Sequence, residues 1–179
     1  GCSTGATLEL IARGLHAPAH LVGIDNADPM SQRARQRLDQ IKTSHTTEIR
    51  TQDLTCIPEL PQASVIVLNY TLHFLPLRDR VELLRKAHNA LIPGGLLFVA
   101  DKVLCRTERA QNLFDERYRD HKFKNGYSRA EIERKAQALR NVLVPLSVDD
   151  QMALIRSAGF RHTEIVFKWH NFMSVIALK

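Results

Sequence analysis

The sequence has few of the residues that build disulfide frameworks and metal sites. Its three cysteines are odd in number and widely spaced, and none belongs to a C-x-x-C pair. That usage argues against a disulfide framework and fits a reducing compartment. The eight histidines are scattered and form no H-E-x-x-H group. We therefore predict no metal site and a cytoplasmic location.

Long apolar runs are lacking as well. A membrane span needs ~20 apolar residues in succession, whereas the longest runs here, Val65–Leu68 and Gly95–Ala100, have the length of buried strands. The first residues show no charged region followed by an apolar one, so no signal peptide is indicated. Hydrophobic residues make up 44% and charged residues 25%, a composition typical of a globular protein rather than a disordered one.

What is present is an alternation of strand and helix patterns. Such alternation predicts an α/β fold, a mostly parallel sheet with helices on both faces. The predicted strands are Leu21–Asp25, Thr46–Thr51, Ala63–Asn69 and Leu96–Lys102, and the predicted helices are Ala6–Gly14, a segment that begins at Asp28, and Leu77–Leu91.

Local signals refine three of these elements. Asp28 is the expected N-cap of its helix, with Pro29 at the first helical position. The segment Pro93–Gly95 is expected to end the helix before it. The successive apolar residues of Val65–Leu68 predict that their strand is buried.

The pattern changes after Lys102. Two helices, an additional helix and an antiparallel hairpin are predicted at Arg106–Asp120, Ser128–Leu143, Val148–Ala158, and Thr163–Lys168 with Phe172–Ala177. Because no repeat or linker interrupts the chain, we predict one domain over residues 1–179, with a helical insertion at about 106–143.

Gly1 and Gly5 flank a turn that leads into the first predicted helix. A glycine turn at a strand-to-helix junction lets the backbone approach a ligand, and the helix N-terminus offers N–H groups. Ser3 replaces the middle glycine of G-x-G-x-x-G, so the turn alone is weak evidence. Asp25 strengthens it, because an acid about 20 residues further on accepts hydrogen bonds from ribose hydroxyls. Asp25 as a helix cap is the alternative, which we disfavour because Asp28 is better placed.

Two more polar residues follow predicted strands. Asp53 comes after Thr46–Thr51 and can accept a hydrogen bond from adenine N6, or it is a turn residue. Asn69 ends the strand Ala63–Asn69. Ligands of open α/β sheets gather at the carboxyl ends of the strands, so these positions together predict a nucleoside site.

The residues of this site resemble a known family. The segment Gly1–Thr7 (GCSTGAT) resembles the first motif of class I S-adenosylmethionine methyltransferases, which have a Rossmann-like fold. In that family the glycine turn holds the methionine end, one acid holds the ribose and a second meets adenine. The resemblance implies S-adenosyl-L-methionine as cofactor, bound by Gly1, Cys2, Ser3, Gly5, Asp25, Asn26, Asp53, Leu54 and Asn69.

A narrower resemblance extends over nearly the whole chain. The sequence is similar to the carboxy-S-adenosyl-L-methionine synthase family at Ile24–Asn26, Val67–Leu75, Asn125–Ser128, Asn141–Val142 and Asn171–Lys179. Of these, Asn125–Ser128 and the last strand are specific to that group. The resemblance implies that prephenate gives up a carboxylate to the sulfonium methyl group and leaves as phenylpyruvate. It also implies a homodimer, and an indirect role for tRNA, because a partner enzyme uses the product to make 5-oxyacetyluridine at the wobble position.

One position departs from that family. Its members usually carry Lys-Arg in the helix after Asn125–Ser128, and the Arg grips the transferred carboxylate, whereas this sequence has Lys135 and Ala136. We expect Arg140, one helical turn further on, to replace that Arg as a catalytic residue. Tyr127 is the second catalytic candidate if it lines the pocket, although it can equally pack against the sheet.

Two other functions remain open. Without a cation near the methyl group, methyl transfer to a small molecule or RNA is the better interpretation. The net charge of +6 also allows a non-catalytic nucleic-acid-binding module on the helices between Arg106 and Lys135. The acids among them (Glu108, Asp115, Glu116, Asp120, Glu131 and Glu133) argue against a continuous phosphate-binding face.

The first strand of this fold is expected to lie upstream of Gly1. In the strand order 3-2-1-4-5, the glycine turn follows a central first strand, and this sequence begins at the turn. We expect that strand, the preceding helices and part of a substrate lid to precede the sequence. The second and fourth strands would then each lack a partner, which predicts a gap or a distorted pairing between them.

Overall fold

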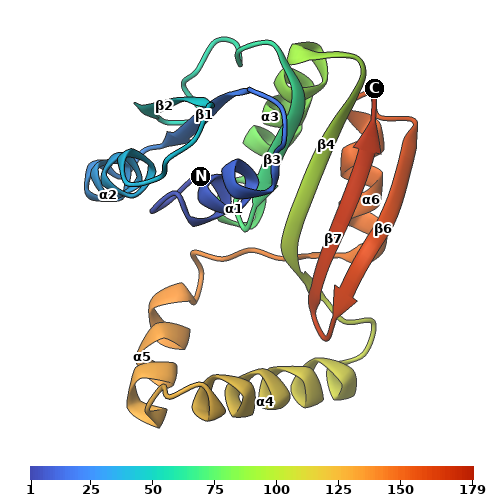
Figure 1. The fold of residues 1–179 in the computed structure, drawn as a ribbon. Coiled ribbons are helices and arrows are strands. Elements are labelled where there is room, and N and C mark those ends of the chain that lie inside the picture. The colour runs from blue at the N-terminus through green and yellow to red at the C-terminus, as the bar shows by residue number, and fades with distance from the viewer. The chain divides into compact units, whose positions relative to one another are not determined.

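A computed structural model describes residues 1–179 as two compact units, Gly1–Leu60 and Pro61–Lys179 (Figure 1). The strands form two hydrogen-bonded sheets, with the order β1-β2 in the first unit and β3-β4-β7-β6 in the second. Strand β1 pairs with β2 alone, and β3 pairs with β4 alone. That the two units act as a single domain stays a prediction.

The first unit runs α1 (Ala6–Gly14), β1 (His20–Asp25), α2 (Asp28–Asp39) and β2 (Thr46–Thr51). Its two strands are parallel, with Asp25 opposite Thr51, so their carboxyl ends share one edge. Gly5 precedes α1 with φ +77°, and a Cβ atom there would lie 3.2 Å from the backbone of Ala34. Only glycine fits this left-handed position without displacing α2.

The second unit is built on a mixed sheet. Strand β3 (Ala63–Asn69) is parallel to β4 (Leu91–Leu104), whereas β7 (Phe172–Leu178) is antiparallel to both β4 and β6 (His162–Trp169). The short β5 (Leu146–Ser147) adds to the end of β4. The predicted C-terminal hairpin is therefore confirmed.

Two helices cover one face of this sheet. In Figure 1, α3 (Leu77–Ala90) and α6 (Val148–Ser157) lie against the same face. The short 3-10 turn η1 (Leu72–Phe74) precedes α3 in the chain. The core between sheet and helices is fully buried at Leu83, Leu84, Leu97, Val99, Ile155, Phe160 and Val175.

The predicted helical insertion forms α4 (Glu108–Lys124) and α5 (Arg129–Leu139). Thr107 caps α4, and Ser128 and Glu131 form a reciprocal capping box at the start of α5. No residue of α4 is buried, and Ile132 is the buried residue of α5. These two helices are therefore fixed by local capping more than by a core.

One expected helix cap and one expected strand start were wrong. The N-cap of α2 is Ala27, and Asp28 is the first helical residue, because the Asp25 side chain accepts the N–H of Ala27 at 3.0 Å and sets the chain direction one residue earlier. Helix α3 ends at Ala90, and Pro93–Gly95 lies inside β4. The β3–β4 register shifts there, so this segment forms a bulge in the strand.

The expectation of a buried β3 was also wrong. Leu68 is its buried residue, and Val65 is 54% exposed. In its sheet β3 is the terminal strand and pairs with β4 alone. An apolar run therefore marks a strand correctly, but burial also depends on what covers its outer edge.

Arg80 links three parts of the second unit and gives a test of its stability. Its side chain is fully buried, and its guanidinium donates to the carbonyls of Leu75 at 2.8 Å, Val144 at 2.7 Å and His73 at 3.4 Å. Arg80→Leu should lower the free energy of unfolding by about 2–4 kcal/mol, because three carbonyls lose a hydrogen-bond donor that is itself buried.

Urea denaturation measures this change. Arg78→Leu is the matched control, because the Arg78 side chain is 87% exposed on the same helix, and its effect should stay within about 0.5 kcal/mol. Equal effects of the two substitutions would show that the buried guanidinium does not hold these segments together.

Candidate cofactor site

The Asp25 carboxylate joins the opening loop to the start of α2. Its Oδ2 accepts the N–H of Ser3 at 2.8 Å, and its Oδ1 accepts the N–H of Ala27 at 3.0 Å. The side chain is half-buried at the carboxyl end of β1. Each carboxylate oxygen has a second lone pair, so both can still accept a hydrogen bond from a ribose hydroxyl.

Backbone hydrogen bonds hold the loop itself against β1. The N–H of Cys2 donates to the carbonyl of Ile24 at 2.9 Å, and the N–H of Gly5 donates to the carbonyl of Cys2 at 2.9 Å. No side chain caps the first turn of α1, so the positive end of its helix dipole lies at this loop. The arrangement suits a carboxylate such as that of a methionine group.

Asp53 lies at the same edge of the two-stranded sheet. Its Oδ1 accepts the Thr55 N–H at 2.8 Å and the Thr55 hydroxyl at 2.7 Å. These hydrogen bonds, with a further one from the Asn26 side chain, lower the pKa of Asp53. The N–H of Gln52 donates to the carbonyl of Asp25 at 2.9 Å, which ties the two strand ends together. Asp53 is therefore an ionised acceptor, suited to an exocyclic amine.

Most of the predicted cofactor residues are brought together in the first unit, at the carboxyl ends of β1 and β2: Gly1, Cys2, Ser3, Gly5, Asp25, Asn26 and Asp53. Leu54 follows Asp53 and is half-buried. Asn69 ends β3 in the second unit, and its membership of the site stays a prediction. Asp25 also contacts the start of α2, the role that the sequence argument had given to Asp28.

The two predicted catalytic residues lie on the α4–α5 segment. Tyr127 follows Gly126, which has φ +90° in the turn between the helices, and Tyr127 is 54% exposed. Arg140 is the C-cap of α5 and is exposed. It therefore closes the helix instead of lying within it. Both catalytic roles stay predictions.

Sequence reasoning missed a buried polar cluster formed by His73, Asp101 and Gln151. Nδ1 of His73 lies 3.0 Å from both Asp101 Oδ1 and the backbone N of Lys102, and the Gln151 amide donates to Asp101 Oδ2 at 3.1 Å. The Lys102 N–H is a fixed donor, so Nδ1 of His73 accepts its hydrogen bond. No sequence spacing connects these residues, because the sheet and α6 bring them together.

The structure also has a hollow away from these residues, and it shows no candidate metal cluster and no candidate membrane span. A hollow of about 330 Å³ between α4 and α5 is lined by none of the predicted site residues. No group of three or more His, Cys, Asp or Glu side chains is arranged to hold a metal ion. None of the helices combines the length and the apolar character that crossing a membrane requires.

Comparison with known proteins identifies the family of the chain. The sequence model of a family described as a methyltransferase domain matches residues 1–97. The structure of human N-acetylserotonin methyltransferase in complex with SAM superposes with a TM-score of 0.66 at 18% identity, over 100% of this chain and 46% of that one. The fold and family thus define an enzyme of the S-adenosylmethionine-dependent methyltransferase class.

Curated relatives narrow the assignment. Carboxy-S-adenosyl-L-methionine synthase of Trichodesmium erythraeum (strain IMS101) is 44% identical over 100% of this chain and 70% of its own length. The protein of that name from Actinobacillus succinogenes is 38% identical over 100% of this chain and 74% of its own length. The chain belongs to the carboxy-S-adenosyl-L-methionine synthase family. It is a transferase-type enzyme whose cofactor is S-adenosylmethionine.

The residues at the first-unit edge fit this cofactor, with a carboxylate for the ribose, an ionised acid for the adenine amine and a helix N-terminus for the methionine carboxylate. Asp25→Ala should weaken S-adenosylmethionine binding by about 1–3 kcal/mol, since it removes the predicted ribose acceptor and the loop contact. Isothermal titration calorimetry measures the affinity.

Asp28→Ala is the control, because Asp28 is an exposed acid only three residues away, in the first turn of α2. It should bind S-adenosylmethionine as the unsubstituted protein does. Unchanged affinity in Asp25→Ala would remove Asp25 from the cofactor site.

Proposed function

We propose that this protein makes carboxy-S-adenosyl-L-methionine from S-adenosylmethionine and prephenate. The observation that carries the proposal is similarity over the whole chain, at 44% and 38% identity, to proteins named for that synthesis. The geometry of Asp25 against the glycine loop supports the cofactor half of the reaction.

The proposed reaction balances without an additional reactant. Prephenate loses a carboxyl group and a hydroxide and leaves as phenylpyruvate. A carbon–carbon bond forms between the carboxyl carbon and the sulfonium methyl group, and the methyl proton leaves with the hydroxide as water. S-adenosylmethionine supplies a methyl group that the adjacent sulfonium makes acidic.

The chain's own residues orient the reactants in this proposal. Asp25 fixes the ribose and Asp53 the adenine, so the methyl group is held at one position. Arg140 is assigned to the transferred carboxylate, because a guanidinium fork binds carboxylates through two hydrogen bonds. Tyr127 is assigned to the pocket wall. Exclusion of water would keep the released carboxyl group beside its acceptor.

The proposed setting of the enzyme follows from its family. We propose that the product serves 5-oxyacetyluridine formation at the tRNA wobble position, so that tRNA is an indirect partner. We also propose a cytoplasmic location and a homodimer.

Methyl transfer is the second candidate, and Ala136 favours it. The family usually has Arg at this position, and alanine offers no charge to a carboxylate. A methyltransferase acting on a small molecule or RNA needs mainly alignment of nucleophile, methyl group and sulfur.

Mass spectrometry separates the two candidates. The protein is incubated with S-adenosylmethionine, with and without prephenate, and the nucleoside product is weighed. Carboxy transfer predicts a carboxymethyl sulfonium product that appears only with prephenate, together with phenylpyruvate. Absence of that product, with S-adenosylhomocysteine formed on addition of a methyl acceptor, would establish methyl transfer instead.

The role of Arg140 is tested by Arg140→Ala. If its guanidinium holds the transferred carboxylate, formation of the carboxylated product should fall about 10- to 100-fold, because a charged hydrogen bond contributes about 1.5–3 kcal/mol. Cofactor affinity should not change. Arg134→Ala, an exposed Arg on the same helix, is the control. Full activity of Arg140→Ala would show that another cation binds the transferred carboxylate.

A further inference from the structure

Lys122 occupies an unusual position on α4. Its ammonium lies 4.2 Å from the ring centroid of Tyr118, over the ring, and its side chain is half-buried. No carboxylate lies within 4.0 Å of it, whereas the Lys102 ammonium is 2.9 Å from Asp115. Lys122 is therefore a partly desolvated cation without an acidic partner.

The charges around Lys122 are of the same sign. Its pKa is lowered first by burial and then by Lys135, Lys102 and Arg119. These three residues come from α5, β4 and α4 itself. A cation gathered with other cations in a half-buried position is unfavourable for the protein alone, and a bound anion would relieve the repulsion.

Tilted and edge-to-face aromatic contacts connect this cation with the end of β3. The Tyr118 ring lies 4.8 Å from the Phe172 ring, and Phe172 lies 5.8 Å from Tyr70. Tyr70 directly follows Asn69 and has φ +54°, a strained conformation that occurs at functional sites. Lys122 therefore belongs to the same cluster as the strand end at which ligands of this fold gather.

Phenol groups complete the surroundings of Lys122. Burial raises the pKa of Tyr118, and Tyr70 and Tyr127 raise it further, so both phenols lie within electrostatic range of Tyr118. Neutral phenols donate hydrogen bonds to carboxylates. An ammonium with phenol donors and an aromatic floor suits a small carboxylate that carries a ring.

We propose that Lys122 binds a carboxylate of the anionic second substrate, with Lys135 and the phenols of Tyr118 and Tyr127 beside it. This rests on the proposed function for the identity of the substrate, prephenate, which is a dianion. Two carboxylates call for two cationic contacts, so Lys122 adds to the role assigned to Arg140.

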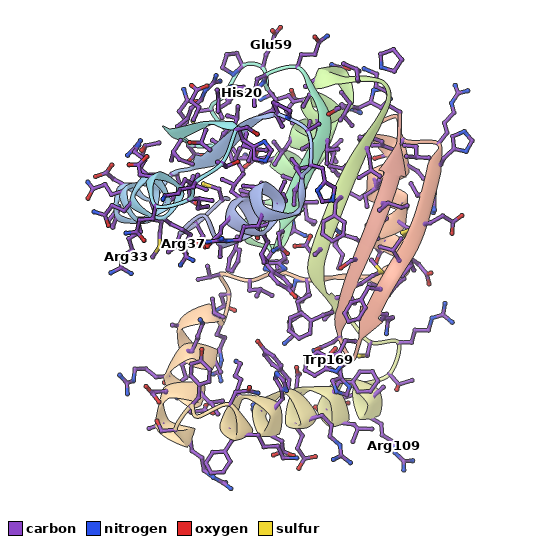
Figure 2. All side chains as sticks on the ribbon, viewed as in Figure 1. His20, Arg33, Arg37, Glu59, Arg109 and Trp169 are labelled. Atoms are coloured by element: carbon purple, nitrogen blue, oxygen red, sulfur yellow. The ribbon has the colours of Figure 1, made fainter.

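The test measures binding of prephenate directly. Trp169 is the only tryptophan of the sequence, and its ring lies 6.1 Å from Tyr118. Figure 2 shows it at the end of the β6–β7 hairpin next to α4. Its fluorescence is followed as prephenate is added to the protein with S-adenosylhomocysteine bound, so that no turnover occurs.

Lys122→Met keeps the aliphatic side chain and removes the charge. It should raise the Kd for prephenate about 10- to 100-fold, the loss expected for a charged hydrogen bond. Lys122→Arg should restore most of the affinity. Lys124→Met is the matched control, because Lys124 is exposed on the same helix, and its Kd should equal that of the unsubstituted protein.

A stability measurement separates binding from a structural role. The lowered pKa of Lys122 means that its charge costs stability at neutral pH. This cost falls as the pH rises through the pKa of Lys122 in the folded protein, and it is gone above the pKa in the unfolded chain. Lys122→Met should therefore unfold at the same or a higher temperature. A marked fall in its Tm, or an equal weakening of S-adenosylhomocysteine binding, would overturn the proposal.

The outcomes also distinguish this proposal from the proposed function. Unchanged prephenate affinity in Lys122→Met overturns the role of Lys122, even if carboxylated product forms. Loss of affinity in Lys122→Met supports that role, even if mass spectrometry finds no carboxylated product and the proposed reaction fails.

Discussion

The Asp25 carboxylate accepts hydrogen bonds from two backbone N–H groups, and the geometry of the candidate cofactor site depends on these two bonds. One N–H comes from the glycine loop before α1 and the other from the first residue before α2. A single side chain therefore joins the loop before α1 to the start of α2. Its carboxylate oxygens remain able to accept from a ligand. Loop shape and ligand recognition cannot be altered independently at this position.

Local patterns in the sequence were sufficient to predict most elements of the fold. The predicted helix Ala6–Gly14 and strands Thr46–Thr51 and Ala63–Asn69 match the structure at both ends, because glycine turns and apolar runs act over a few residues. The proximity of Asp25 to the glycine loop was also predictable, since parallel strands place successive carboxyl ends at one edge. The N-cap of α2 was harder to predict. The Asp25 side chain accepts the Ala27 N–H at the start of this helix, and this contact forms only in the folded loop.

Features that depend on distant contacts could not be predicted. The bulge at Pro93–Gly95 exists because β4 must realign with β3, and the exposure of Val65 depends on which strands flank β3. Lys122 carried a weak signal that was overlooked. Four residues before Lys122 on α4 is Tyr118, and four residues after it is Gly126, beyond the end of the helix. The helix therefore offers Lys122 no acidic partner at this spacing, whereas Lys124 has Asp120. Its cationic neighbours on β4 and α5 become visible only in three dimensions.

The central place of β7 has a consequence for how the second unit acquires its structure. Strand β7 lies between β4 and β6, and Val175 and Ala177 within it are almost fully buried. On a ribosome, β4 would emerge about 70 residues before this partner, and such non-local pairing is slow to form. The helices between these strands can form earlier from local contacts. Until β7 is made, one hydrogen-bonding edge of β4 has no partner strand and apolar side chains of β4 are exposed. This interval is the period in which the nascent protein is most prone to aggregate.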